Sequence, residues 1–244
     1  MIVDLHAHFG RWFFPTFADD PRAVSRLCDT FGIEKAVFSS SLAITYKMET
    51  GNRELARFLT YDPRFYGYIY VNPSRPQDSK REIHTYIQSS RFVGVKLHPS
   101  YSSAPADSPQ TVRLLEALPE GKLVLVHTWG VDGVGQTCRL ASKLPQHRFI
   151  MGHMGGTSES GWRAAIKESQ GLPNVWLEIC GSLLHYDRIA EAVDTLGPAR
   201  IVFGSDMTLI SPAFALGQVL DAAIPQSAKR MILRENALKL LAGD

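Results

Sequence analysis

Histidine and aspartate residues recur at the ends of short apolar segments in this chain. His6 and His8 end the first of these segments. His127 and His153 each end a later one, and Asp206 ends the last. Removing neutral imidazoles and a carboxylate from water is costly without partners, and one divalent cation can satisfy such groups together. The pattern therefore predicts a metal site, against the alternative that each residue is satisfied by local hydrogen bonds.

The metal that such a set prefers follows from its donor atoms. Imidazole nitrogens combined with a carboxylate oxygen suit Zn²⁺, and Mn, Fe and Co accept the same donors. Water bound to Zn²⁺ has its pKa lowered to about 7, which provides hydroxide at neutral pH. We therefore expect one divalent ion as the cofactor of an enzyme, with zinc as the favoured metal.

The segments that must position these residues number eight, and they are rich in β-branched and aromatic side chains. Their centres are about 25–32 residues apart, which is the length of one strand-loop-helix-loop unit. Strands that alternate with helices in this way form a parallel sheet, and eight of them close into a barrel. The predicted strands cover residues 2–8, 35–40, 65–71, 92–98, 122–127, 148–153, 174–180 and 200–206.

The stretches between the strands carry apolar residues at three- and four-residue spacing, as amphipathic helices do. Asp20-Pro21 and Ser211-Pro212 are typical helix starts, with an N-cap followed by proline. No linker or low-complexity stretch divides the chain. We predict one (β/α)8 TIM-barrel domain over residues 1–244 with an extra C-terminal helix. A doubly wound open sheet would normally need a glycine-rich loop where this first strand ends in histidines.

Functional residues of such barrels lie at the C-terminal ends of the strands, and alternate residues on a strand point inward. This alternation predicts which residues share the interior face. We expect Asp4, His6 and His8 to face inward opposite Val3 and Leu5, Lys96 and His98 opposite Val95 and Leu97, and three further sets to share a face: Leu123, Leu125 and His127; Phe149, Met151 and His153; Val202, Gly204 and Asp206.

Five motifs occur along the chain: His6-Ala-His8, Lys96-Leu-His98-Pro, His127-Thr-Trp129, Gly152-His153-Met-Gly-Gly156 and Gly204-Ser-Asp206. Together and in this order they resemble the amidohydrolase superfamily. The branch resembled is the amidohydrolase-related group that includes aminocarboxymuconate-semialdehyde decarboxylase and related hydrolases and hydratases. The resemblance spans the whole chain, and residues 232–241 resemble the closing helix of that branch.

The resemblance implies a role for each matching residue. His6, His8, His127 and Asp206 become the ligands of one catalytic metal. His153 becomes the residue that polarises or protonates the substrate. The physical reading agrees, since Asp206 can accept a proton from metal-bound water and an imidazole can serve a developing oxyanion.

Lys96, His98 and Trp129 are predicted to bind substrate. Lys96 has two other interpretations: in binuclear members of the superfamily a carboxylated lysine on this strand bridges two metals, and a structural salt bridge to Glu178 is equally compatible with the sequence. Trp129 follows His127 by two residues and would form a wall of the site.

The net charge, the lack of long apolar segments and the number of cysteines narrow the expected partners and location of the protein. The net charge is +2 from 26 basic and 24 acidic residues, which gives no reason to expect nucleic acid or an anionic membrane as partner. No secretory signal or long apolar run is evident, so we expect a cytoplasmic protein that acts on a small molecule and that could form a homodimer. Three separated cysteines make a disulfide framework unlikely, and we interpret Cys28, Cys138 and Cys180 as small hydrophobic residues.

Two reactions fit these residues. The first is hydrolysis of a small amide, lactam, lactone or ester by metal-activated water. The alternative is non-oxidative decarboxylation or hydration of a small unsaturated or aromatic carboxylic acid. Both use the same ligands, so the motifs do not separate them. A barrel that binds metal without activity, or a deoxyribonuclease of the related barrel family, fits less well, because His153 is intact and the mid-barrel acidic motif of that nuclease family is missing.

Overall fold

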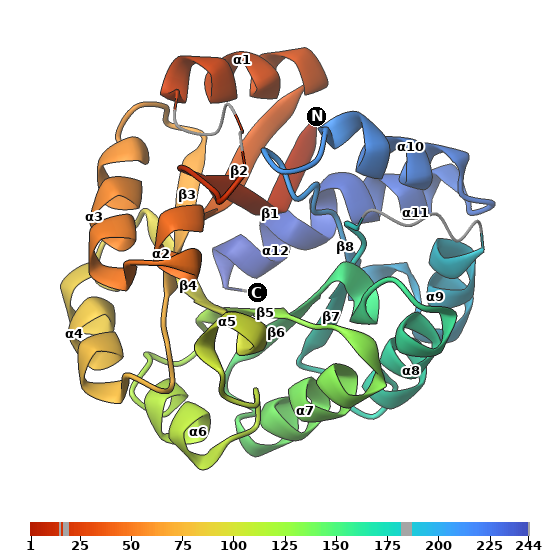
Figure 1. Ribbon diagram of the computed structural model, residues 1–244. Helices are drawn as coiled ribbons and strands as arrows, with labels where there is room; N and C mark the ends of the chain where they lie inside the picture. The colour runs from red at the N-terminus through yellow and green to blue at the C-terminus, as the bar shows by residue number, and fades with distance from the viewer. Residues whose placement is uncertain (15, 17–19, 182–186, 244) are drawn as a thin grey trace.

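Eight parallel strands form a ring around which the helices are arranged (Figure 1). The structure is a computed structural model and describes residues 1–14, 16, 20–181 and 187–243. Each strand pairs with the next along the chain. Backbone hydrogen bonds from Leu5 N to Phe203 O (3.0 Å) and from Asp206 N to His6 O (2.8 Å) join the last segment to the first. The predicted (β/α)8 barrel is confirmed.

All eight predicted strands are present, although the last is shorter than expected. They are β1 (Ile2–Phe9), β2 (Ile33–Ser40), β3 (Phe65–Tyr70), β4 (Phe92–Leu97), β5 (Leu123–His127), β6 (Arg148–Gly152), β7 (Val175–Glu178) and β8 (Ile201–Val202).

The helices follow the strands as the sequence pattern predicts, and the N-caps Asp20 and Ser211 each accept a hydrogen bond from the first turn of their helix. Short 3-10 segments occur at His153–Gly155 and Pro198–Arg200, and a π-helical turn at Met231–Glu235 precedes the last helix. The helices are α1 (Pro21–Phe31), α2 (Ser41–Thr45), α3 (Met48–Phe58), α4 (Pro76–Tyr86), α5 (Pro99–Ser102), α6 (Pro109–Leu115), α7 (Gly130–Lys143), α8 (Glu159–Ser169), α9 (Arg188–Leu196), α10 (Pro212–Asp221), α11 (Gln226–Arg230) and α12 (Asn236–Ala242).

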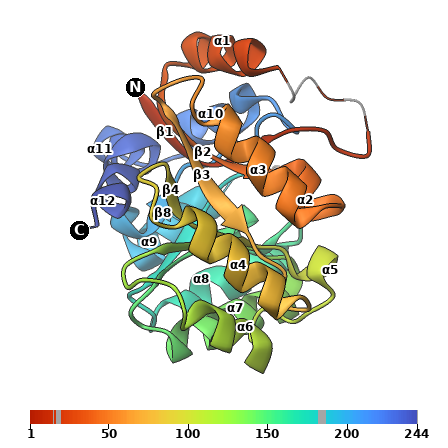
Figure 2. The same ribbon diagram turned by 90° about the vertical axis from the view of Figure 1, so that its left-hand side faces the viewer.

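The hydrophobic core has two parts. A large outer part fills the space between the strands and the surrounding helices. A smaller inner part lies within the barrel, where Val3, Leu125 and Ile150 pack with Ala237 and Leu240 of α12. Figure 2 shows α12 at one end of the barrel, with α2 and α5 at the other. The C-terminal helix therefore closes the end of the barrel away from the strand termini that carry the histidines.

Simple alternation predicts the interior face correctly on β4, β5 and β8. Val95 and Leu97 lie in the outer core, as expected if Lys96 and His98 face inward. The inner cluster includes Leu123, Leu125 and Val202, also as expected.

The predicted faces of β1 and β6 are wrong. Val3 and Leu5 belong to the inner cluster, because the pairing of β1 with β2 shifts register between Asp4 and Ala7 and the alternation changes there. On β6 it is Ile150 that faces inward, whereas Phe149 and Met151 lie in the outer core. His153 adopts a left-handed backbone (φ 60°) directly after this strand. Irregular backbone, and not regular pleating, brings these histidines to the rim.

Candidate metal centre

His6, His8 and Asp206 meet at the C-terminal end of the barrel. Asp206 Oδ1 lies 3.1 Å from His8 Nε2 and 3.8 Å from His6 Nε2. All three side chains are buried. Within the described part of the chain, Asp206 Oδ1 has no hydrogen bond of acceptable geometry. A buried carboxylate oxygen that faces two imidazole nitrogens and lacks a donor is a fitting place for a divalent cation.

The backbone around β1 and β8 holds this group in place. Asp206 has a left-handed backbone (φ 59°), and its N–H donates to His6 O. Ser205 donates to the Asp4 carboxylate through both its backbone N–H (3.1 Å) and its hydroxyl (2.5 Å). Asp4 also accepts from the His6 N–H (3.0 Å), so one carboxylate fastens the two ligand-bearing segments together. Burial raises the pKa of Asp4 to about 7.

The protonation states suit metal binding. Burial lowers the pKa of His8 to about 4 and that of His153 to about 3, so both rings are neutral at pH 7. Burial alone would raise the pKa of Asp206, but the neighbouring His8, His6 and His153 outweigh it and hold the pKa well below its usual range. A carboxylate beside neutral imidazoles is the state that a divalent cation requires.

Glu178 determines which ring nitrogen of His6 is unprotonated. Burial alone would raise the pKa of Glu178, but His6 and other neighbours lower it to about 2. The ionised carboxylate can only accept hydrogen bonds, so His6 Nδ1, at 2.8 Å, must carry the proton. His6 Nε2 then carries the lone pair of the ring. This arrangement is the usual one for a metal-binding histidine. His6 Nε2 lies 3.8 Å from Asp206 Oδ1 and accepts a hydrogen bond from Lys96 Nζ at 2.8 Å.

Lys96 lies beneath the same group and is completely buried. Its Nζ is 2.8 Å from His6 Nε2, and burial lowers its pKa to about 8. The salt bridge between Lys96 and Glu178 that the sequence left open is not formed, because Glu178 pairs with His6 instead. Lys96 contacts a predicted ligand and does not line the cavity in front of it.

His127, the fourth predicted ligand, lies apart from the other three. Its Nδ1 is 2.9 Å from His153 Nε2, and it belongs to neither set of close ligand atoms. His98 stacks on one side of its ring (3.8 Å between centroids), and Trp129 lies parallel to the ring at 5.5 Å. Burial lowers the pKa of His98 to about 2 and that of His127 well below its usual value. These residues form an aromatic wall beside the metal-binding group.

The sequence predicted Cys180 to be a small, buried or half-buried hydrophobic residue; it is buried, but its sulfur makes polar contacts. All three cysteines are buried, but Cys180 Sγ lies 3.0 Å from Glu178 Oε2 and 3.1 Å from His153 Nδ1. Strand alternation could have found both Glu178 and Cys180. Leu177 lies in the outer core, so residues 178 and 180 follow the inward face of β7 toward the same rim as the histidines.

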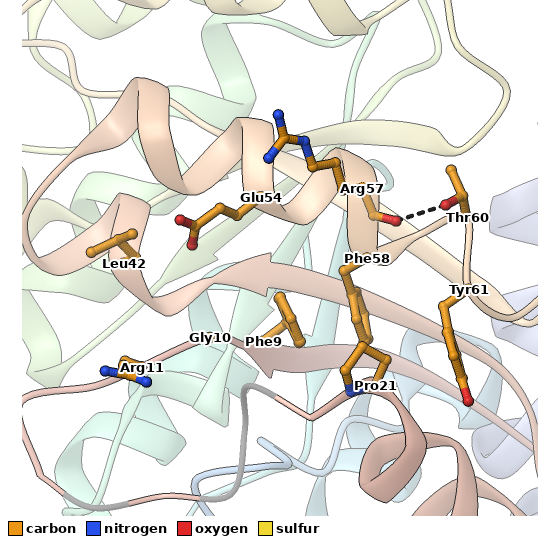
Figure 3. Close-up of a pocket in the computed structure, with 10 residues that line it drawn as sticks. All are labelled: Phe9, Gly10, Arg11, Pro21, Leu42, Glu54, Arg57, Phe58, Thr60 and Tyr61. Carbon is orange, nitrogen blue, oxygen red and sulfur yellow. Dashed lines mark hydrogen bonds between the residues drawn. The ribbon is translucent and has the colours of Figure 1, made fainter.

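A cavity of about 190 Å³ opens above this group. A larger cavity of about 630 Å³ lies outside the barrel wall, where Phe9 of β1 stacks on Phe58 of α3 (Figure 3). Among the described residues, no predicted ligand lines the larger cavity, so the smaller one is the candidate active site. Its lining consists of His8, Trp12, His98, His127, Trp129, His153, Gly181, Asp206, Leu209 and Ile210.

The family model for amidohydrolases matches residues 3–242. This chain belongs to the amidohydrolase family. It is therefore an enzyme with a site for a divalent metal ion, as the sequence predicted. No curated protein matches the sequence. No helix in the described ranges is both long and apolar enough to span a membrane.

Several solved structures share the fold. The 2,6-dihydroxybenzoate decarboxylase from Rhizobium is 18% identical, with 99% of this chain and 98% of that chain covered and a TM-score of 0.76. A dihydroxybenzoic acid decarboxylase from Polaromonas, with bound manganese and 2-nitroresorcinol, is 19% identical over 99% and 96% of the two chains (TM-score 0.79). A probable 2-pyrone-4,6-dicarboxylic acid hydrolase from Acinetobacter baumannii, with citric acid bound, is 14% identical over 99% of both chains (TM-score 0.71).

Proposed function

We propose that this amidohydrolase-family enzyme hydrolyses a small amide, lactam, lactone or ester. The observation that carries the proposal is the buried Asp206 Oδ1, which lacks a hydrogen bond of acceptable geometry and faces His8 and His6 at the floor of a small cavity. His6, His8 and Asp206 would hold one divalent ion, with His127 of β5 as the fourth ligand. We propose zinc, and manganese is the alternative because the Polaromonas relative binds it. When bound, the ion supplies a water molecule of lowered pKa.

The residues of the chain divide the remaining work. Asp206 is ionised and accepts a proton from the attacking water. His153 is neutral and lies at the cavity, where it takes up the proton that Asp206 has accepted and passes it to the oxygen on which negative charge develops. His98 and Trp129 line the cavity and contact the substrate, and Lys96 supplies positive charge from beneath His6.

The cavity limits the size of the substrate. An apolar cavity of about 150 Å³ is enough to bind benzene, so about 190 Å³ holds one small ring with few substituents. The parallel rings of His98, His127 and Trp129 favour a flat molecule. We therefore propose a small planar substrate.

Decarboxylation of a small aromatic acid is the second candidate. The flat aromatic wall favours it, and two of the structural relatives are dihydroxybenzoate decarboxylases. The same metal-binding group would hold the carboxylate or an adjacent hydroxyl of the substrate, and His153 would supply the proton that replaces the carboxyl group.

One experiment separates the two reactions. The Zn²⁺- or Mn²⁺-loaded enzyme is incubated in H₂¹⁸O with panels of small lactones, esters, amides and hydroxybenzoic acids. Hydrolysis places ¹⁸O in the product acid, whereas decarboxylation releases CO₂ and leaves no such label in the product. Turnover that Asp206→Asn leaves unchanged would contradict both candidates.

A further inference from the structure

Glu178 links two histidines to which we assign different roles. Its carboxylate accepts from His6 Nδ1 (2.8 Å) and from the backbone N–H of His153 (3.1 Å). It also accepts from the backbone N–H and the thiol of Cys180. All four residues are buried. A single carboxylate therefore fixes the position of a proposed metal ligand and of the backbone that carries the proposed acid.

The thiol of Cys180 extends this link to the ring of His153. Cys180 Sγ donates to Glu178 Oε2 at 3.0 Å and lies 3.1 Å from His153 Nδ1. A thiol has one proton to donate, and here it is directed to Glu178. The sulfur can then only accept from His153, so Nδ1 of that ring carries the proton.

The short distances favour hydrogen bonds over a second metal ion in this cluster. His6, His153, Glu178 and Cys180 do place four ligand atoms close together. Sulfur and nitrogen ligands on a tetrahedral zinc ion are about 3.5 Å apart, given zinc bonds of about 2.3 Å and 2.0 Å. The sulfur contacts of 3.0 and 3.1 Å and the 2.8 Å from His6 Nδ1 to Glu178 Oε2 are shorter, and the sulfur lies 3.4 Å from His6 Nδ1. Three of these four distances are those of hydrogen bonds.

We propose that Cys180, held by Glu178, is a positioning residue that fixes the tautomer of His153. Nδ1 of His153 is protonated against the sulfur, and Nε2 keeps its lone pair on the side of His127 and the cavity. This inference rests on the proposed role of His153 in catalysis. In a catalytic His–Asp pair a carboxylate holds the ring and stabilises its positive charge. A thiol orients the ring in the same way but carries no negative charge.

A glycine two residues after the end of β8 leaves the space that this network needs. A Cβ atom on Gly204 would lie 2.4 Å from Glu178 Oε1 and 2.7 Å from His6 Cβ. These contacts are far inside normal packing distances, and the His6 atom is the first carbon of a buried side chain, fixed by the backbone of β1. Gly204→Ala would therefore displace Glu178 without changing its charge. This variant disturbs the network from outside the hydrogen-bonded residues themselves.

The test is ¹⁵N NMR of the Zn²⁺-loaded enzyme labelled at histidine, with the signals of His153 assigned by their loss in His153→Asn. We expect a protonated Nδ1 and an unprotonated Nε2 in the wild type and in Cys180→Ser, because a hydroxyl can also donate and accept. Cys180→Ala should give a mixture of tautomers, and its kcat should fall about 10- to 100-fold with metal content unchanged. Cys28→Ala and Cys138→Ala, at the other buried cysteines, should leave the His153 signals unchanged.

The wild-type spectrum can overturn the inference without any variant. A His153 protonated at Nε2 would contradict it, and so would an unchanged tautomer in Cys180→Ala. A thiolate-to-metal absorption band that appears with a second zinc equivalent would show that the cluster binds metal, which would also overturn it. Failure of the proposed function looks different: His153→Asn would then leave turnover unchanged, whatever the tautomer of His153 in the wild type.

Discussion

Near the α12 end of the barrel, Leu123 and Leu125 of β5 pack against apolar side chains, including Leu240 of α12. Two residues further along the same strand, His127 lies beside His98 and His153. The first environment is built from aliphatic side chains and the ring of Tyr68, and the second from imidazoles, carboxylates, a thiol and a buried lysine. Both environments are removed from water, and the barrel wall is continuous between them.

The two ends gain their stability differently. Apolar side chains at the α12 end are stabilised by burial alone, at about 25 cal/mol per Å² of surface removed from water. Polar groups at the rim are costly to bury unless each has a partner. Most have one here, but His8 Nδ1, His98 Nδ1 and Asp206 Oδ1 have none among the described residues. These three atoms belong to residues that line the cavity, which is where an ion and a substrate would supply partners.

The largest expected effect comes from His6→Ala. Removing a buried ligand should empty the metal site and abolish detectable turnover, because catalysis depends on the metal-bound water. Metal content of the purified variant, measured by mass spectrometry, checks this. His84→Ala, at an exposed histidine on α4, is the matched control. We expect His127→Ala to empty the site as well. If only His127→Ala keeps its full metal content, His127 is not a ligand. Full metal content in His6→Ala would contradict the proposed metal site.

His153→Asn should keep its metal while kcat falls. General acid–base groups typically contribute about 10²- to 10⁴-fold, so the decrease should lie in that range. The pH–rate profile should also lose one limb, since one of the two titrating groups is gone. Steady-state kinetics and metal analysis on the same preparation check both points. Loss of metal in this variant would instead make His153 a ligand.

Leu125→Ala tests the apolar end alone. Leu125 is completely buried, and truncation of such a side chain typically costs about 2–5 kcal/mol of unfolding free energy. We expect that loss in urea unfolding, with metal content unchanged in the folded protein. Leu220→Ala, at a residue that is 51% exposed on α10, should change stability little. If Leu125→Ala loses metal while it remains folded, the two ends are not independent.

Lowering the pH should destabilise the metal-free protein because of the buried histidines at the C-terminal end of the barrel. Burial lowers the pKa values of His8, His98, His127 and His153 below about 6.5, the value in the unfolded chain, so only the unfolded state takes up these protons as the pH falls from 6.5 toward 4. Asp4, with its pKa raised to about 7, acts in the opposite direction and offsets one of the four.

Each net proton changes the unfolding free energy by about 1.4 kcal/mol per pH unit. Stability should therefore be fully present above pH 6.5 and decrease toward pH 4. Urea unfolding in the presence of a chelator at several pH values measures this slope, and His153→Asn should reduce it by about one proton. A stability that is constant between pH 6.5 and 4 would contradict the neutral, buried state of these imidazoles.

The sequence was sufficient to predict the barrel, because its eight apolar segments recur at one spacing and local propensity and periodicity agree. It also placed five predicted site residues on one rim. It could not predict which residues of β1 and β6 point into the barrel. A register shift and a residue with left-handed backbone do not change the pattern of apolar positions in the sequence. The hydrogen-bond partners of Glu178 could not be predicted either. Whether a buried carboxylate pairs with a lysine or with an imidazole depends on differences of about 1 Å between side chains on different strands.

The central claim is that one divalent ion is held at the rim by His6, His8 and Asp206. Anomalous diffraction from crystals grown with Mn²⁺ tests it most directly, in the wild type and in Lys96→Ala. We predict a single peak within bonding distance of His6 Nε2, His8 Nε2 and Asp206 Oδ1, at about 2.0–2.2 Å, in both proteins. A second peak beside Lys96 that disappears in Lys96→Ala, or the absence of any peak at Asp206, would contradict it.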